Sequence, residues 1–245
     1  MTDEFCAPAS RRVDLLAAML IGLAALATLG LILHHPVLHS RGNIVQVATG
    51  VEALAGMDRL IHGGLMAVMF AQAVGFYLFS VRLGLGRPAV AAGFLAFAGG
   101  LVVMTIPATL DGFVTPDLAR ACLGSVQRCG PGDVAGFQLV VAMIQDFTKL
   151  ALVAMAIATL CWSIALAASK GGLRRAAAVA GLACAAAPLW ILLTSDLRLT
   201  PASLAGIIAA QVVWSLVVAG LLVHDAGLGV RAGVDAAIEP PRPAA

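Results

Sequence analysis

The chain has 245 residues, of which 61% are hydrophobic and 11% are charged, and its formal net charge is +2. A soluble domain usually carries about a quarter charged residues, so this composition excludes an ordinary water-soluble core. Because the net charge is small and no basic patch is interleaved with aromatic residues, nucleic acid is excluded as an expected partner. We therefore expect the lipid bilayer to be the main partner of the chain.

Six long apolar stretches are separated by short segments that carry most of the charged residues. A bilayer core about 30 Å thick needs about 20 residues of helix, and the stretches lack the alternation of membrane barrel strands. The pattern predicts an all-α, polytopic membrane protein with six transmembrane helices. The predicted spans are 13–33, 60–81, 88–110, 150–168, 176–195 and 202–223.

The first span follows Arg11 and Arg12, an arrangement that also occurs in signal peptides. Its apolar run is too long for a signal peptide and no small-residue cleavage site follows, so we expect an uncleaved helix. Between the first two spans, residues 34–58 are expected to include a helix lying at the membrane interface. Short basic turns at 82–87 and 169–175 should join the second to the third span and the fourth to the fifth as tight hairpins.

The distribution of Lys and Arg predicts the orientation. The side that holds both termini carries nine basic residues in its tails and turns, and the opposite side carries five. Because basic residues favour the cytoplasmic side, both termini are expected in the cytoplasm of a cell with the protein in its inner membrane. Residues 1–12 would form a cytoplasmic tail, 13–223 a single transmembrane domain, and 224–245 a disordered cytoplasmic tail.

Two of the five cysteines, Cys122 and Cys129, lie in the longest loop on the outer side. An oxidising compartment would let them form a disulfide, although a metal site and free thiols remain alternatives. Cys161 and Cys184 lie inside spans, where cysteine behaves as a small buried hydrophobic residue.

A weak internal repeat relates the two halves of the chain. The basic turn at 82–87 resembles the turn at 170–175, and an Asp-x-x-x-Thr-Pro sequence occurs at 111–116 and again at 196–201. This predicts a duplicated helical hairpin whose copies form a four-helix core, with the first and sixth helices at the flanks. Chance similarity is the alternative, and Thr-Pro has a local explanation as a helix start.

Nearly all the notable polar side chains fall at the outer ends of the spans. One hypothesis is a vestibule in which a small set of them converges on a ligand or a proton path. Its members would be Asp58, His62, Asp111, Asp146 and Lys149. The alternative is an interfacial salt bridge between Asp146 and a snorkelling Lys149. Both should stay outside the lipid, because a charge at the bilayer centre costs about 2.5–3.5 kcal/mol.

His62 lies one helical turn after Asp58, which could orient its imidazole as in many ligating or proton-transferring histidines. A packing role is the alternative, because single interfacial histidines often have no other. Haem b is not expected, since no second histidine lies within a facing span, unless Met66, Met69 or Met104 served as axial ligand.

Three further histidines, His34, His35 and His39, follow the first span. If the segment were helical, His35 and His39 would share a face and offer a weak zinc or copper site. Pro36 argues against a regular helix, so solvated loop histidines are the alternative. No cofactor is therefore predicted from these residues.

Short motifs in the first half of the chain resemble those of a group of bacterial multi-pass membrane proteins that have no assigned activity. They are His-Pro at 35–36, Asp-Arg-Leu-Ile-His-Gly at 58–63, and Gly-Phe-Val-Thr-Pro at 112–116. The resemblance implies a bacterial inner-membrane location and no particular reaction.

Three functions are compatible with the sequence. The first is a non-catalytic membrane subunit that binds another membrane protein, or a second copy, through faces of small residues such as Ala89, Gly93 and Gly100. The second is a small transporter, and the third is a redox or metal-handling protein that uses His62 or the histidines at 34–39. No Walker loop, zinc-protease motif or nucleophile elbow occurs, so the sequence favours a non-enzymatic role.

Overall fold

The structure is a computed structural model that describes residues 11–35, 43–124, 129–194, 199 and 201–238. Within these residues every regular element is a helix, so the all-α prediction is confirmed. In chain order the helices are α1 (Arg11–Leu33), α2 (Ile44–Leu83), α3 (Pro88–Thr109), the π-helix η1 (Leu110–Val114), α4 (Thr115–Gly124), α5 (Pro131–Ala167), α6 (Gly172–Thr194) and α7 (Pro201–Ile238).

Six helical segments are long and apolar enough to cross a bilayer, as the sequence predicted. The third of them is the continuous run α3, η1 and α4. The chain is thus a multi-pass helical membrane protein, a class that its composition already required.

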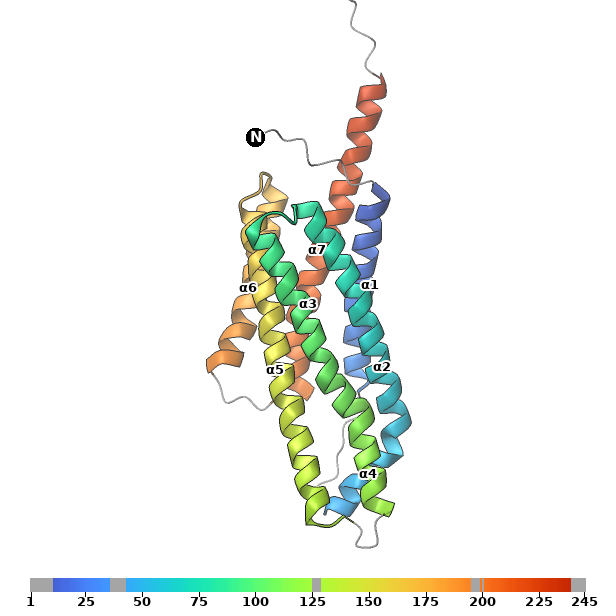
Figure 1. The fold of residues 1–245 in the computed structure, drawn as a ribbon. Helices are drawn as coiled ribbons and strands as arrows, with labels where there is room; N and C mark the ends of the chain where they lie inside the picture. The colour runs from blue at the N-terminus through green and yellow to red at the C-terminus, as the bar shows by residue number, and fades with distance from the viewer. Residues whose placement is uncertain (1–10, 36–42, 125–128, 195–198, 200, 239–245) are drawn as a thin grey trace, which may run out of the picture.

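Two helices are longer than predicted. The interfacial helix expected within 34–58 is the first part of α2, which runs unbroken for 40 residues from a capping box between Asn43 and Gln46. In the same way, α5 has 37 residues and begins at Pro131. At 1.5 Å per residue these helices measure about 55–60 Å, nearly twice the bilayer core. Both therefore extend beyond the lipid on the side where α4 lies (Figure 1).

The C-terminal helix also exceeds its predicted span. α7 continues past position 223 to Ile238, so most of the expected tail is helical. Residues 239–245, the proline-rich part of that tail, lie outside the described residues.

The six long helices pack in a closed sequence around the bundle axis. Each packs on its neighbour in the order α1, α2, α3, α5, α6 and α7, and α7 returns to α1 (Figure 1). The expected four-helix core would have placed α1 and α7 at the flanks. Instead these two helices pack along each other, and the backbones of α2 and α5 lie on opposite sides of the ring.

The hydrophobic core lies in the middle of the bundle. Trp162 of α5 stacks on Phe76 of α2, with ring centroids 4.7 Å apart, and Phe97 of α3 packs against both rings. Gly93 lets α3 approach α5 so closely that an added Cβ would lie 3.1 Å from Trp162. The small-residue face of α3 is therefore used inside the protein, and Gly100 likewise packs on α5.

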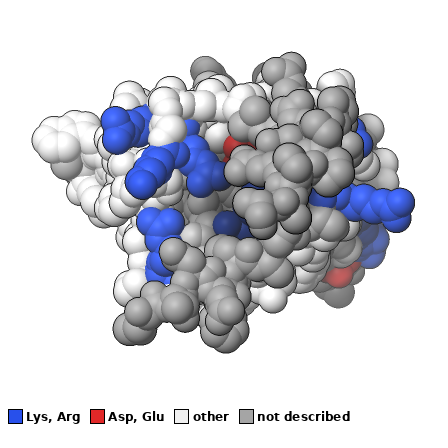
Figure 2. Space-filling view, turned by 90° about the horizontal axis from the view of Figure 1, so that it is seen from above, with Lys and Arg blue, Asp and Glu red and all other residues white. Residues whose placement is uncertain are grey.

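One end of the bundle, which we call the arginine end, holds ion pairs between neighbouring helices. Arg82 at the end of α2 lies 3.5 Å from the buried Asp14 of α1, and Arg174 of α6 lies 2.7 Å from Asp225 of α7. Figure 2 looks onto this end and shows several Lys and Arg side chains gathered on it. The basic turns predicted from the sequence thus lie together on one face.

The opposite end, which we call the disulfide end, carries the parts of α2 and α5 that extend beyond the lipid. Cys122 in α4 and Cys129 form a disulfide with a Cα–Cα distance of 4.5 Å. They pack with Ala48 and Val51 of α2 and with Phe137 of α5. This small core ties α4 to the two long helices.

Candidate functional site

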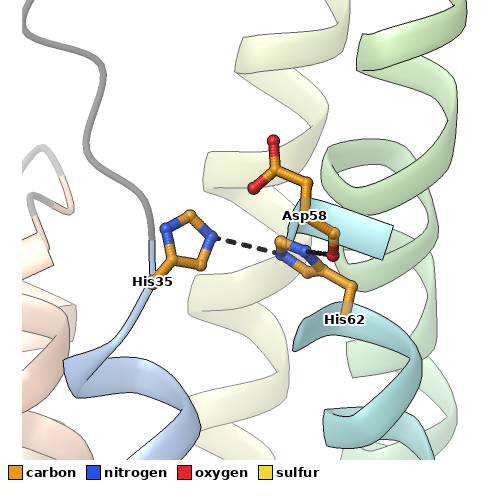
Figure 3. A group of neighbouring side chains, drawn as sticks. All are labelled: His35, Asp58 and His62. Atoms are coloured by element: carbon orange, nitrogen blue, oxygen red, sulfur yellow. Dashed lines mark hydrogen bonds between the residues drawn. The ribbon is translucent and has the colours of Figure 1, made fainter. Parts of the chain in front are cut away.

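Four ionisable side chains meet where the bundle narrows toward the disulfide end. Asp58 and His62 come from α2 and His35 follows the last turn of α1 (Figure 3). The fourth, Asp111, lies in η1. We call these four residues the His–Asp cluster. The histidine His62 and the carboxylate Asp58 are buried, at 5% and 9% exposure.

The π-helix places Asp111 in this cluster. Pro107 cannot donate a backbone hydrogen bond inside α3, and three residues later the helix widens into η1. Gly112, the next residue after Asp111, faces His62, and a Cβ added to it would lie 2.4 Å from the Cβ of His62. Only glycine allows this approach of η1 to α2, so Gly112 brings the Asp111 carboxylate to the imidazole.

Three atoms from three elements lie at nearly equal separations. The Nε2 atoms of His35 and His62 are 3.4 Å apart, and Oδ2 of Asp111 lies 3.5 Å from the first and 3.3 Å from the second. A ligand atom of Asp58 lies within 4.8 Å of those of both histidines. Two imidazole nitrogens and the Asp111 carboxylate thus lie around one point, and the Asp58 carboxylate lies close to the same two imidazoles.

The orientation of His62 is fixed by its own helix. Its Nδ1 lies 2.9 Å from the carbonyl oxygen of Asp58, as Figure 3 shows. Because a carbonyl can only accept, Nδ1 must carry the hydrogen, and neutral His62 then presents the lone pair of Nε2 to the cluster. Metal-ligating histidines commonly have this arrangement, in which the second nitrogen donates to a backbone carbonyl.

When both histidines are neutral, the cluster has fewer hydrogens than it has close contacts between nitrogen and oxygen atoms. His35 Nε2 can donate one hydrogen, either to Asp111 or to His62. The lone pair of His62 Nε2 then faces the carboxylate of Asp111 at 3.3 Å with no hydrogen between them. An additional proton or a bound cation would relieve this repulsion.

Of the residues predicted for a vestibule, the structure brings together Asp58, His62 and Asp111 but not the two from α5. Asp146 is exposed and Lys149 is half-buried, and neither makes an ion pair among the described residues. Lys149 instead lines a surface groove with Gln138, Ala142 and Gln145 of the same helix.

The three histidines after the first span separate. His34 donates from Nδ1 to the carbonyl oxygen of Gly30 and faces away from the cluster, and His39 lies outside the described residues. His35 alone joins the cluster. The contact between His35 and His62 was not predicted. The sequence has no second histidine within a span that faces His62, and His35 lies just beyond the end of one.

A cavity of about 380 Å³ adjoins the cluster and continues along the bundle axis. His35, His62 and Asp111 line it at the disulfide end, and Gln72 and Gln211 line it deeper in the bundle. Most of the remaining lining side chains are apolar and come from α1, α2, α3, α5 and α7. The space along the axis left by the ring of helices is thus open to the His–Asp cluster.

Comparisons with protein family models, with curated proteins and with solved structures gave no match. The fold and the site therefore define the protein only as a class: a six-span helical membrane protein with a His–Asp cluster at the mouth of an axial cavity. Any more specific function must be argued from that cluster.

Proposed function

We propose that this protein binds a divalent transition-metal ion at the His–Asp cluster and so handles metal in the bacterial inner membrane. His35, His62 and Asp111 would supply the ligands, with Asp58 as a fourth ligand or as a partner of the bound ion. The site would face the periplasm, because the arginine end carries the basic residues that favour the cytoplasm.

One observation supports this proposal above the others. Two donor atoms bound to one tetrahedral zinc ion at about 2.0–2.1 Å lie about 3.3 Å apart. The three separations in the cluster are 3.3, 3.4 and 3.5 Å. The ligand atoms of His35, His62 and Asp111 are therefore spaced as a small tetrahedral ion requires.

The chemistry of the donors supports zinc or a similar ion. Imidazole nitrogen suits Zn²⁺, Cu²⁺, Fe²⁺ and Ni²⁺, whereas Mg²⁺ and Ca²⁺ prefer sites made only of oxygen. Haem is a poorer fit, because Oδ2 of Asp111 lies 3.5 and 3.3 Å from the two Nε2 atoms, in the space that a porphyrin between the histidines would need. The two carboxylates would neutralise the charge of a divalent ion.

One of the arguments for an accessory subunit, a free face of small residues on α3, no longer applies. The small-residue face of α3 that was expected to bind a partner helix packs on α5 instead, at Gly93 and Gly100. A metal-binding protein can still have a partner, but no described feature of these helices calls for one.

The proposal can be tested by measuring zinc binding to purified protein after removal of bound metal with a chelator. We expect one zinc ion per chain by elemental analysis and loss of binding in His62→Ala. The matched control is His34→Ala, which removes the adjacent histidine that faces Gly30. If His62→Ala bound zinc as tightly as His34→Ala, the cluster would not be the metal site.

A further inference from the structure

The axial cavity reaches well below the His–Asp cluster. Gln72 lines its deeper part and follows His62 by ten residues on the same helix, which corresponds to about 15 Å along the axis. That distance is about half the thickness of a bilayer core. Beyond this level the stacked rings of Phe76 and Trp162 fill the bundle. The cavity thus extends to the middle of the membrane and stops there.

Two polar atoms in the wall of the cavity have no protein partner. Oγ1 of Thr28 and Nε2 of Gln211 are buried and make no hydrogen bond within the described residues. Both residues line the cavity. A buried polar atom in a protein is almost always hydrogen-bonded, and leaving one unpaired costs about 1–3 kcal/mol. Whatever fills the cavity must therefore offer hydrogen-bond partners to Thr28 and Gln211.

Two pairs of polar residues, Gln72 with Ser215 and Thr159 with Gln211, form what we call the collar. Gln72 of α2 donates to the hydroxyl of Ser215 of α7 at 3.2 Å, and Thr159 of α5 lies 3.4 Å from Gln211 of α7. Thr159 uses its single hydroxyl hydrogen for the carbonyl of Met155 at 3.1 Å, so toward Gln211 it is best placed to accept. With the amide turned over, its nitrogen would donate to Thr159, and the oxygen of Gln211 would take the place of the nitrogen as the unpaired atom.

Water fits both the size of the cavity and its unpaired atoms. A volume of about 380 Å³ corresponds to roughly a dozen water molecules at about 30 Å³ each. An apolar chain would fill the space but leave Thr28 and Gln211 unpaired. Near the His–Asp cluster, the carboxylate of Asp111 lines the cavity and favours cations over anions, with the Asp58 carboxylate close behind it in the same cluster.

We infer that the cavity is a water-filled path by which a divalent cation passes from the His–Asp cluster to the collar at Gln72 and Gln211. This inference rests on the proposed metal site for the identity of the cation, and it makes the protein a candidate for moving that cation. The uncharged amide oxygens of Gln72 and Gln211, which line the cavity, would replace part of the water around the ion. The aromatic rings below would close the path toward the arginine end.

The path can be tested by modifying a cysteine placed in the collar. Gln211→Cys is made in a chain whose Cys6, Cys161 and Cys184 are serine, with the disulfide retained, and the protein is held in nanodiscs. Two membrane-impermeant probes are compared: the cationic trimethylammonioethyl and the anionic sulfonatoethyl methanethiosulfonates. The matched control is Val213→Cys, two residues along α7, whose native side chain is 51% exposed on the outer face of the bundle.

We expect the cationic probe to modify Gln211→Cys and to leave Val213→Cys unmodified in the lipid. We compare the ratio of the cationic to the anionic modification rate at Gln211→Cys with the same ratio for a free thiol in solution. The ratio at Gln211→Cys should be larger by at least about tenfold, because carboxylates of the His–Asp cluster lie where the probes enter. Asp111→Asn should reduce this preference, and saturating zinc should slow the cationic probe. Failure of both probes to reach position 211 would overturn the path.

The two proposals fail in different ways. If zinc does not bind but the cationic probe still reaches Gln211→Cys with its preference intact, the metal assignment is wrong and the water-filled path stands. If zinc binds but position 211 is unreactive, the cavity is dry and the path is overturned. If zinc binds and leaves the rate of modification unchanged, the bound ion and the path are unconnected, which also overturns the inference.

Discussion

The carboxylates described at the arginine end and those of the His–Asp cluster have different partners. At the arginine end Asp14 lies beside Arg82, and Asp225 lies beside Arg174 with His224 3.7 Å away. At the disulfide end Asp58 and Asp111 face two imidazoles, and no arginine takes part in the contacts of the cluster within the described residues. Guanidinium groups lie beside Asp14 and Asp225, whereas Arg59 and Arg120 near the disulfide end pair with Asp117 and Glu52 and leave the carboxylates of the His–Asp cluster beside imidazoles.

The two kinds of partner differ in how they respond to pH and to metal ions. A guanidinium stays charged throughout the physiological pH range, so its ion pair with a carboxylate on a neighbouring helix does not change with pH there. An imidazole changes its charge near neutral pH and also binds metals. Placing imidazoles beside carboxylates at the mouth of a cavity therefore gives an assembly whose stability depends on what occupies it.

The largest difference between the ends should appear when one carboxylate is neutralised at each. Asp111→Asn keeps the size of the side chain but removes a charged ligand, so we expect zinc affinity to fall by about 100-fold or more, equivalent to about 2.7 kcal/mol. Asp14→Asn removes a carboxylate from the arginine end and should leave zinc affinity within about twofold. Isothermal titration of the metal-free proteins measures both; equal losses in the two variants would contradict the comparison.

A smaller effect on zinc affinity is expected from Gly112→Ala, which alters no ligand. The added Cβ would lie 2.4 Å from the Cβ of His62, too close for any real contact, so η1 must move away from α2. Changes that displace metal ligands in this way typically cost about 10–100-fold in affinity. The matched control is Gly99→Ala in α3, where an added Cβ meets nothing within 4 Å. Equal zinc affinity in both variants would show that the approach of η1 is unimportant.

The number of spans was predictable because it depends on a local property. An apolar stretch of about 20 residues must be satisfied by its own helix in lipid, whatever surrounds it. The helix ends were less predictable. α2 begins at Ile44 and α5 at Pro131 because capping residues start them well before the lipid, and a hydropathy pattern does not weigh caps against membrane thickness.

The site was predictable only in part. Asp58, His62 and Asp111 share one end because alternate spans run in opposite directions, which follows from the hairpins. Asp146 lies at the same height, but the rotation of α5 turns it outward, and rotation depends on packing. His35 lies past the end of α1, and Asp111 lies in the π-helix η1. Their contacts with His62 therefore depend on the tertiary structure alone.

At the arginine end we expect a change in stability without a change in binding. Arg82→Met leaves Asp14 buried at 3% exposure without its guanidinium, which should cost on the order of 2 kcal/mol. A thermal unfolding assay in detergent should show a lower midpoint for this variant than for Arg11→Met, a change at the exposed start of α1. Zinc affinity should be unchanged in both. A loss of zinc binding in Arg82→Met alone would mean that the two ends are coupled.

The smallest effect on the site should come from the disulfide itself, although it lies at the same end. Cys122 and Cys129 pack in a separate apolar cluster with Ala48 and Phe137. The bond closes a short loop, and a disulfide of this kind contributes about 2–3 kcal/mol by restricting the unfolded chain. Replacing both cysteines with serine should therefore lower the unfolding midpoint while zinc affinity stays within about twofold. If affinity fell as far as in Gly112→Ala, the part of the protein beyond the lipid would be holding η1 in place, and the binding role would belong to the whole disulfide end rather than to the His–Asp cluster.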